Sequence, residues 1–98
     1  MSFGDIDADI KAKIIGILHT LFPGAKIYLY GSRARGTNRE YSDIDLAIDT
    51  GKPQINIGEA RAIFEASHIP YKIDIVDLQS ASPKLREMIL KDGKIWNR

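Results

Sequence analysis

The run from Asp43 to Asp49 constrains the fold most, because small or acidic residues alternate strictly with aliphatic ones along it. A period of two is that of a β-strand with one buried face. The aliphatic parity consists of Ile44, Leu46 and Ile48, and the other parity consists of Asp43, Asp45, Ala47 and Asp49. This run predicts a sheet with helices against its aliphatic face and with the other parity turned outward.

Two helices are predicted from residue spacing and end signals. Apolar residues recur every three or four positions over residues 5–22, and a Pro-Gly pair then ends that helix. A second helix is predicted over residues 56–67, because Asn56 and Glu59 have the spacing of a capping box.

Two more strands and a last helix complete the expected order. Residues 26–30 are rich in β-formers and end at Gly31, and residues 71–76 alternate apolar and polar side chains. Ser82 and Pro83 supply a cap and a first-turn proline for the last helix. On the last two helices the positions expected to be buried are Ile63, Phe64, Leu85, Met88 and Ile89. The order predicts an α+β fold, a small mixed sheet of about three strands backed by helices, in one domain spanning residues 1–98.

Composition excludes several classes of protein. The absence of cysteine rules out disulfides and thiolate zinc sites, and a net charge of +1 gives no reason to expect direct nucleic-acid binding. No apolar run approaches the ~18 residues of a spanning helix, and the acidic N-terminus is unlike a signal peptide. We therefore expect a cytoplasmic protein with no membrane association.

Paired carboxylates are the first sign of chemistry. Asp43 and Asp45 lie on one face of the predicted strand, about 7 Å apart at the backbone, so their side chains can converge on one ion, and magnesium suits oxygen ligands. Asp49 has the same parity but lies about 13 Å beyond Asp45, too far to share that ion. An isolated Asp-x-Asp is more often a solvated strand face. The Gly31-Ser32 turn, directly after a strand and before the acids, changes that balance, because such a turn can bind phosphate.

The motifs GSRARG (residues 31–36) and SDIDL (residues 42–46) occur in this order in a short chain. In them the sequence resembles the DNA polymerase beta-type nucleotidyltransferase superfamily, and within it the minimal nucleotidyltransferase group. The likeness covers essentially the whole length and implies that family's fold and metal-dependent nucleotidyl transfer.

The resemblance also implies roles for individual residues. Gly31 and Ser32 would hold the β- and γ-phosphates of ATP or another nucleoside triphosphate, with Arg35 and Ser42 as further nucleotide-binding positions. Two Mg²⁺ ions would be bound by the catalytic acids, which are Asp43, Asp45 and Asp74. Asp74 would also help to activate the attacking hydroxyl. Its parity agrees, because it lies opposite the apolar side chains of its strand and can reach the other two acids if the strands are neighbours.

Other polar or aromatic residues receive weaker interpretations. Asp77 has the other parity and is expected in a loop, and Lys72 shares the face of Asp74 as a possible nucleotide contact. Arg33 lies near the turn, whereas Arg39 is expected to be a solvated loop charge. The remaining residues of this kind are expected at the surface or in packing and are His19, His68 and Trp96.

The resemblance implies a partner as well. Members of the minimal group pair with helical HEPN-type toxins, so we expect AMP transfer from ATP to a hydroxyl of such a partner, with tyrosine as the acceptor and this chain as the antitoxin. Two alternatives stay open: a non-catalytic module that binds the toxin, and nucleotidyl transfer to a small molecule such as an antibiotic. A homodimer is also compatible with the sequence.

Overall fold

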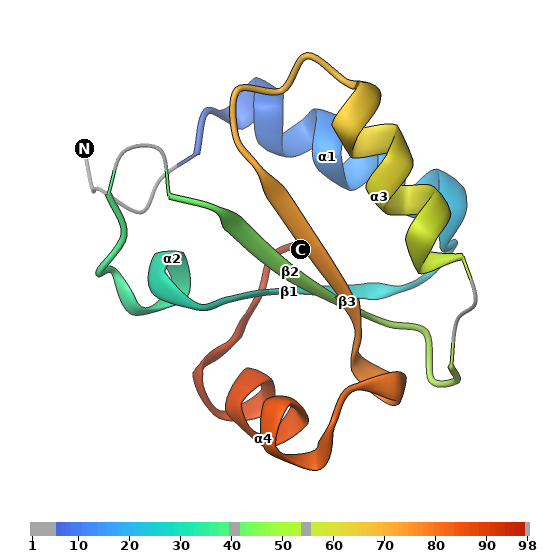
Figure 1. The fold of residues 1–98 in the computed structure, drawn as a ribbon, viewed down its shortest axis with the longest axis vertical. Coiled ribbons are helices and arrows are strands. Elements are labelled where there is room, and N and C mark those ends of the chain that lie inside the picture. Colours follow the sequence, from blue (N-terminus) through green and yellow to red (C-terminus); the bar gives the residue numbers. More distant parts are fainter. Residues whose placement is uncertain (1–5, 40–41, 54–55, 98) are drawn as a thin grey trace.

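A computed structural model of the protein describes residues 6–39, 42–53 and 56–97, and its centre is one four-stranded sheet (Figure 1). The strands are β1 (Lys26–Tyr30), β2 (Ile44–Asp49), β3 (Ile73–Asp77) and β4 (Lys94–Ile95). Their order is β3-β2-β1-β4, with β2 parallel to β3 and antiparallel to β1, and with β4 antiparallel to β1. The sheet is mixed, as predicted, and has one strand more than the three expected.

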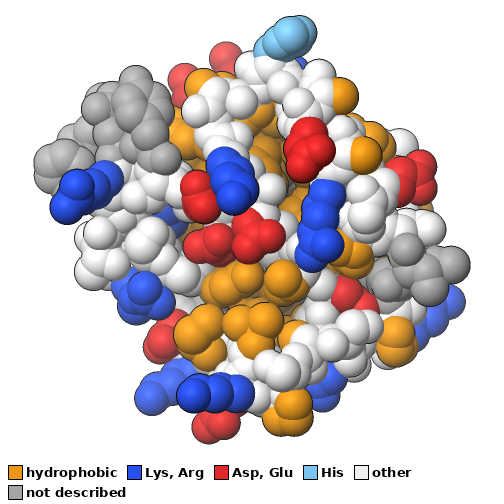
Figure 2. All heavy atoms as spheres, viewed as in Figure 1, with side chains coloured by type: hydrophobic (Ala, Val, Ile, Leu, Met, Phe, Trp, Pro, Cys, Tyr) orange, Lys and Arg blue, Asp and Glu red, His pale blue; other side chains and the backbone are white. Residues whose placement is uncertain are grey.

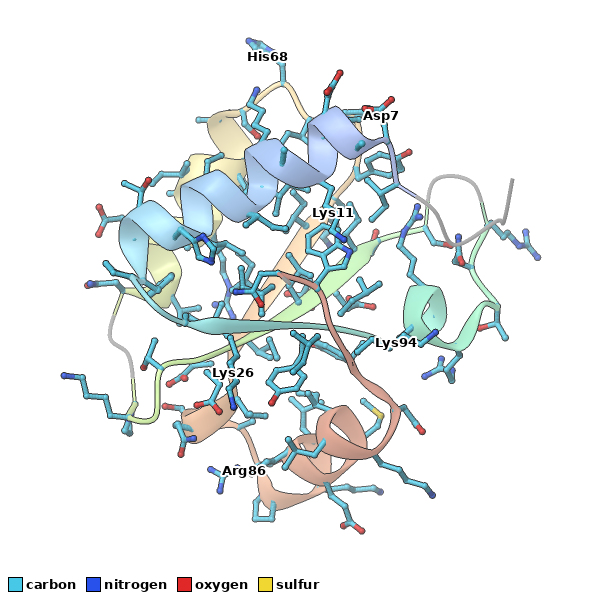
Figure 3. The ribbon with its side chains drawn as sticks, turned by 180° about the vertical axis from the view of Figure 1, so that it is seen from behind. Asp7, Lys11, Lys26, His68, Arg86 and Lys94 are labelled. Carbon is cyan, nitrogen blue, oxygen red and sulfur yellow. The ribbon has the colours of Figure 1, made fainter. Side chains whose placement is uncertain are left out.

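The additional strand belongs to a C-terminal segment that is fastened to β1. The backbone N–H of Trp96 donates to the Ile27 carbonyl at 2.7 Å, and the side chain of Asn97 bonds to the Ile27 N–H and the Ala25 carbonyl at 3.0 and 2.8 Å. The Lys11 ammonium of α1 lies 5.3 Å from the centre of the Trp96 ring (Figure 3). Trp96 is therefore a packing residue, as expected. A two-residue strand leaves no alternation that a sequence could reveal.

Helices cover the two faces of the sheet unequally. The helices are α1 (Ala8–Leu21), α2 (Ser32–Arg35), α3 (Ile57–Ala66) and α4 (Pro83–Asp92), and the 3-10 turn η1 spans Leu78–Ser80. Figure 1 shows α1 and α3 on one face and α4 on the other. None of the helices in the described ranges could cross a bilayer.

The main core lies under α1 and α3. Ile14 and Leu18 of α1 and Phe64 of α3 pack there against the aliphatic parity of β2. Each fully buried aliphatic side chain contributes roughly 1.5–3 kcal/mol to folding. The buried face predicted from the alternation of β2 is confirmed.

The opposite face is less open than predicted. Ala47 has no exposed surface, because it packs with Tyr30, Leu78 and Ile89 beneath α4. The prediction that the whole small or acidic parity of β2 points outward is therefore wrong at Ala47. Asp45 and Asp49, towards the two ends of the strand, stay partly exposed, so the cover on this face is over the middle of β2.

Two details of the helices differ from prediction. Met88 is 37% exposed, so it is not part of the buried stripe of α4, whereas Ile89 is fully buried. Asn56 precedes α3 but its side chain makes no capping hydrogen bond, since its backbone (φ −95°, ψ 14°) is not the extended conformation of a cap. The capping-box prediction is therefore wrong. Helix α1 is capped by Asp7, and the predicted start at residue 5 lies outside the described residues.

Candidate active site

The strand register places three polar side chains in one row across the sheet. Tyr30 of β1 is directly opposite Asp45 of β2, and Asp45 is directly opposite Asp74 of β3. Residues in register on adjacent strands have their side chains on the same face. The two strands that carry Asp45 and Asp74 are thus neighbours, which was the condition for a shared site. In Figure 2 acidic side chains gather at this place, above an apolar patch next to α4.

The Gly31 turn lies directly against Asp45. Gly31 has φ +75° and ψ −153°, a conformation that L side chains rarely adopt. A Cβ atom at this position would collide with Oδ2 of Asp45. Glycine is therefore required twice, for its backbone conformation and for the close approach of the turn to the carboxylate.

The turn continues into the short helix α2, which is closed by a second glycine. The Arg35 N–H donates to the Gly31 carbonyl at 3.1 Å, and the Thr37 N–H donates to the Ser32 carbonyl at 2.9 Å. Gly36 ends the helix in the left-handed conformation (φ +74°). None of the described residues makes a hydrogen bond with the Ser32 hydroxyl, so this group can donate to a ligand.

Arg33 holds Ser42, the residue directly before the acids. Only 4% of its surface is exposed, and its Nε and Nη2 donate to the Ser42 carbonyl at 3.2 and 3.0 Å. Its guanidinium also lies 4.9 Å from the centre of the Tyr71 ring. The Ser42 hydroxyl accepts the Arg39 N–H at 2.7 Å, so Arg33 and Arg39 both hold Ser42 in place directly before the acids. The nucleotide-binding role of Ser42 stays a prediction.

The site has an excess of negative charge. The pKa of Asp45 is raised, first by burial and then by the carboxylates of Asp74 and Asp43, while Arg35 and Lys72 act in the opposite direction. Burial, followed by Asp45 and Asp74, also raises the pKa of Tyr30 to about 12, with Arg61 opposing. Arg35 and Asp74 are exposed, and so is Asp43, which immediately precedes β2. The carboxylates of Asp43 and Asp74 therefore both act on Asp45, as a site for a cation requires.

A metal ion would meet suitable donors here. Within the described ranges, no three acidic or histidine side chains are already arranged to hold a metal ion. The donor chemistry nevertheless fits, since Asp43, Asp45 and Asp74 supply only oxygen ligands and repel one another without a cation. A divalent ion would replace this repulsion by attraction.

Two acids outside the row have structural partners. Asp49 accepts hydrogen bonds from Gln79 Nε2 and the Gly51 N–H, both at 2.9 Å. Asp77 is the last residue of β3 and is 6% exposed, so the prediction that it lies in a loop is wrong. It accepts from the Gln79 N–H at 3.2 Å and from Ser80 Oγ at 2.7 Å, which begins η1. Both carboxylates therefore have hydrogen-bond donors within the fold.

Sequence reasoning missed Tyr30 and Arg61. Tyr30 was assigned only to a strand, and its position beside Asp45 depends on a register that the sequence does not fix. Arg61 of α3 donates from Nη2 to the Ile75 carbonyl of β3 at 2.9 Å. His19 and His68 are exposed, as expected, with His19 Nε2 lying 3.1 Å from Asn97 Nδ2.

Comparison with known proteins places this geometry in context. Residues 12–96 match the family model described as "Polymerase beta, Nucleotidyltransferase". The chain is 34% identical to the probable protein adenylyltransferase MntA of Haemophilus influenzae over 89 residues, which are 89% of this chain and 78% of that protein.

Two solved structures are similar in sequence and in fold. One is a toxin-antitoxin with AMP-PNP (TM-score 0.74, 36% identity, 88% of this chain and 71% of that one). The other is a tri-AMPylated Shewanella oneidensis HEPN toxin in complex with MNT antitoxin (TM-score 0.71, 33% identity, 93% of this chain and 71% of that one). Both agree with the α+β fold expected from the motifs.

Proposed function

Since this chain belongs to the polymerase beta nucleotidyltransferase family, we propose that it transfers AMP from ATP to a hydroxyl of a HEPN-type partner protein in the cytoplasm, and so acts as that protein's antitoxin. The relative from Haemophilus influenzae has the name of a protein adenylyltransferase, and a similar solved complex contains an AMPylated HEPN toxin. Both support a protein rather than a small molecule as the acceptor.

The observation that supports the proposal most directly is the close approach of Gly31 to Asp45. It brings a turn suited to phosphate against a carboxylate suited to a metal ion. In nucleotidyl transfer the metal ions and the polyphosphate must be adjacent, because the ions bind phosphate oxygens. A turn and an acid that served only the fold would have no need of this approach.

The residues of the site would have two roles, binding of the phosphates and binding of the metal ions. Gly31, Ser32 and Arg35 bind and orient the β- and γ-phosphates, and the acids Asp43, Asp45 and Asp74 hold two Mg²⁺ ions. When bound, the ions neutralise charge on the attacking and leaving oxygens.

The transfer itself is an in-line displacement. The acceptor oxygen forms a bond to the α-phosphorus as the bond from that phosphorus to the bridging oxygen breaks. Pyrophosphate departs with the bonding electron pair, and the hydroxyl proton passes to the Asp74 carboxylate. The protein contributes mainly positioning and charge.

Labelling of the partner tests the proposal. The chain, Mg²⁺, the HEPN-type partner and ATP labelled at the α-phosphate should yield labelled partner and pyrophosphate. The Asp43→Ala variant should yield neither, while its circular dichroism spectrum stays that of the wild type. Labelling by this variant would remove Asp43 from the mechanism. If Asp43→Ala does not label the partner but still neutralises the toxin, the protein would instead be a binding module.

A further inference from the structure

Tyr30 belongs both to the row of acids and to the apolar cluster beside it. It is directly opposite Asp45 in the sheet, and its side chain packs with Ala47, Leu78 and Ile89 beneath α4. Figure 2 shows the gathered acids bordering the apolar patch next to α4. The burial of its ring therefore holds this tyrosine at the boundary between the two groups of side chains.

The hydroxyl of Tyr30 has no hydrogen-bond partner among the described residues. Only 7% of the residue is exposed, yet its hydroxyl is not one of the polar atoms that the fold buries completely. The hydroxyl of a mostly buried tyrosine usually has a partner. An O–H group that reaches the surface of the site without one is available to a ligand that binds there.

The hydroxyl also lies within electrostatic reach of the acids. After burial, the carboxylates of Asp45 and Asp74 are the next causes that raise the pKa of Tyr30 to about 12. A tyrosine hydroxyl keeps its proton at neutral pH, so it can donate a hydrogen bond without adding a charge. The group is thus a neutral donor beside the acids that would hold the metal ions.

The order of the strands places the α-phosphate of the nucleotide near this hydroxyl. Gly31 follows β1, Asp45 lies on the central β2, and Asp74 lies on the edge strand β3. In an in-line displacement the attacking and leaving oxygens lie on opposite sides of the phosphorus. With pyrophosphate leaving towards Gly31 and attack from the side of Asp74, the α-phosphorus lies over Asp45. Tyr30 is the residue of β1 that faces Asp45.

We propose that the Tyr30 hydroxyl donates a hydrogen bond to a non-bridging oxygen of the α-phosphate, an inference that rests on the proposed adenylyl transfer. In the transition state charge is spread over the equatorial oxygens of the phosphoryl group, so a fixed donor at one of them lowers the barrier. The proton stays on the tyrosine throughout. None of the roles proposed above uses this hydroxyl.

Two tyrosines of β1 provide a matched test. Tyr28 packs against the same apolar cluster as Tyr30 but is opposite Ala47 instead of an acid. Labelling of the HEPN-type partner would be measured in single turnovers at varied ATP for the wild type, Tyr30→Phe and Tyr28→Phe, after thermal melting shows that all three are folded. Tyr30→Phe should lower the maximal rate roughly 10–100-fold and leave the ATP concentration at half-maximal rate unchanged, because it removes a donor used in the transition state. Tyr28→Phe should behave as the wild type.

Sulfur analogues of ATP identify the acceptor of this bond. In the two diastereomers of the α-thio analogue, sulfur, a weak hydrogen-bond acceptor, replaces one or the other non-bridging α-oxygen. For one diastereomer the bond is already weakened in the wild type, so Tyr30→Phe should slow its transfer less than about threefold. The other diastereomer and ATP should be slowed by the full factor. Equal slowing of all three nucleotides would overturn the contact with the α-phosphate.

The remaining outcomes separate this inference from the proposed function. Unchanged rates of Tyr30→Phe would overturn it and leave the proposed function intact. A higher ATP requirement with an unchanged maximal rate would also overturn it, because the hydroxyl would then contribute to ATP binding and not to the transition state. Absence of labelling by the wild type would overturn the proposed function itself.

Discussion

Two aspartates on the same face of β2 have opposite surroundings. Asp49 accepts hydrogen bonds from Gln79 and Gly51, and the Gln79 bond is the main reason why its pKa is lowered. Asp45, four residues earlier, has a raised pKa because burial and two other carboxylates disfavour its charge. The fold thus provides donors for one acid and like charges for the other. A carboxylate that the fold leaves in this state is a candidate for ligand binding.

The largest expected effect contrasts amide substitutions at these two positions. Asp45→Asn should reduce adenylyl transfer by at least about 10³-fold, because it removes a charged ligand that acts on the transition state. Asp49→Asn should retain activity within about threefold, since its contacts are structural. The measurement is the rate of labelling of the partner at saturating ATP. Comparable losses in the two variants would show that the difference in surroundings has no functional meaning.

Two glycines sharpen the comparison, because only one of them touches the acid. Gly31→Ala introduces a collision with Asp45 and should lower the rate about 10²-fold, as expected for displaced catalytic groups. It should also destabilise the fold by roughly 1–3 kcal/mol.

The matched control is Gly36→Ala. Gly36 has nearly the same φ (+74° against +75°), but an added Cβ there would meet no atom within 4 Å. This variant should lose about 1–2 kcal/mol of stability and keep its activity. Equal rates for the two variants would show that backbone strain, and not contact with Asp45, explains the need for Gly31.

The sequence predicts those parts of the site that depend on interactions between residues close together in the chain. The alternation in β2 is local, so it predicted both the buried face and the shared parity of Asp43 and Asp45. The row of Tyr30, Asp45 and Asp74 depends on strand order and register, which arise from contacts between distant segments. The sequence therefore left that row conditional.

The burial of Ala47 and of Arg33 could not be predicted either, because both side chains are buried by contacts with segments outside their own. Ala47 is buried by α4, which lies more than thirty residues later in the chain and has no pattern linking it to β2. Arg33 is ordered by the Ser42 carbonyl and the Tyr71 ring, and neither contact changes the composition of its own segment.

The pH dependence of stability should differ in sign between the two aspartates. The pKa of Asp45 is raised in the folded protein. Its contribution to the stability of the fold is therefore present at a pH below 3.8, the ordinary pKa of aspartate, and is lost as the pH rises through the raised pKa. The pKa of Asp49 is lowered in the folded protein. Its contribution to the stability of the fold is therefore present at a pH above 3.8 and is lost as the pH falls through the lowered pKa.

Urea unfolding in EDTA therefore separates the two amide variants. At pH 7, Asp45→Asn should raise the free energy of unfolding by roughly 0.5–2 kcal/mol, as found when strained functional residues are replaced. Asp49→Asn should lower it by less than about 1 kcal/mol, since the group is solvent-screened. The difference for Asp45→Asn should shrink as the pH falls through the raised pKa, whereas the difference for Asp49→Asn should persist at pH 4 and shrink only below the ordinary value of 3.8. A loss of stability in Asp45→Asn would contradict the repulsion inferred at the site.

The smallest effect is the response of the free energy of unfolding to magnesium. At a Mg²⁺ concentration near the Kd, binding to the folded state alone adds about 0.4 kcal/mol. The wild type and Asp49→Asn should show this gain, whereas Asp45→Asn should not, because the repulsion that an ion would relieve is already absent. An equal gain in all three proteins would place the ion elsewhere and remove Asp45 from the metal site.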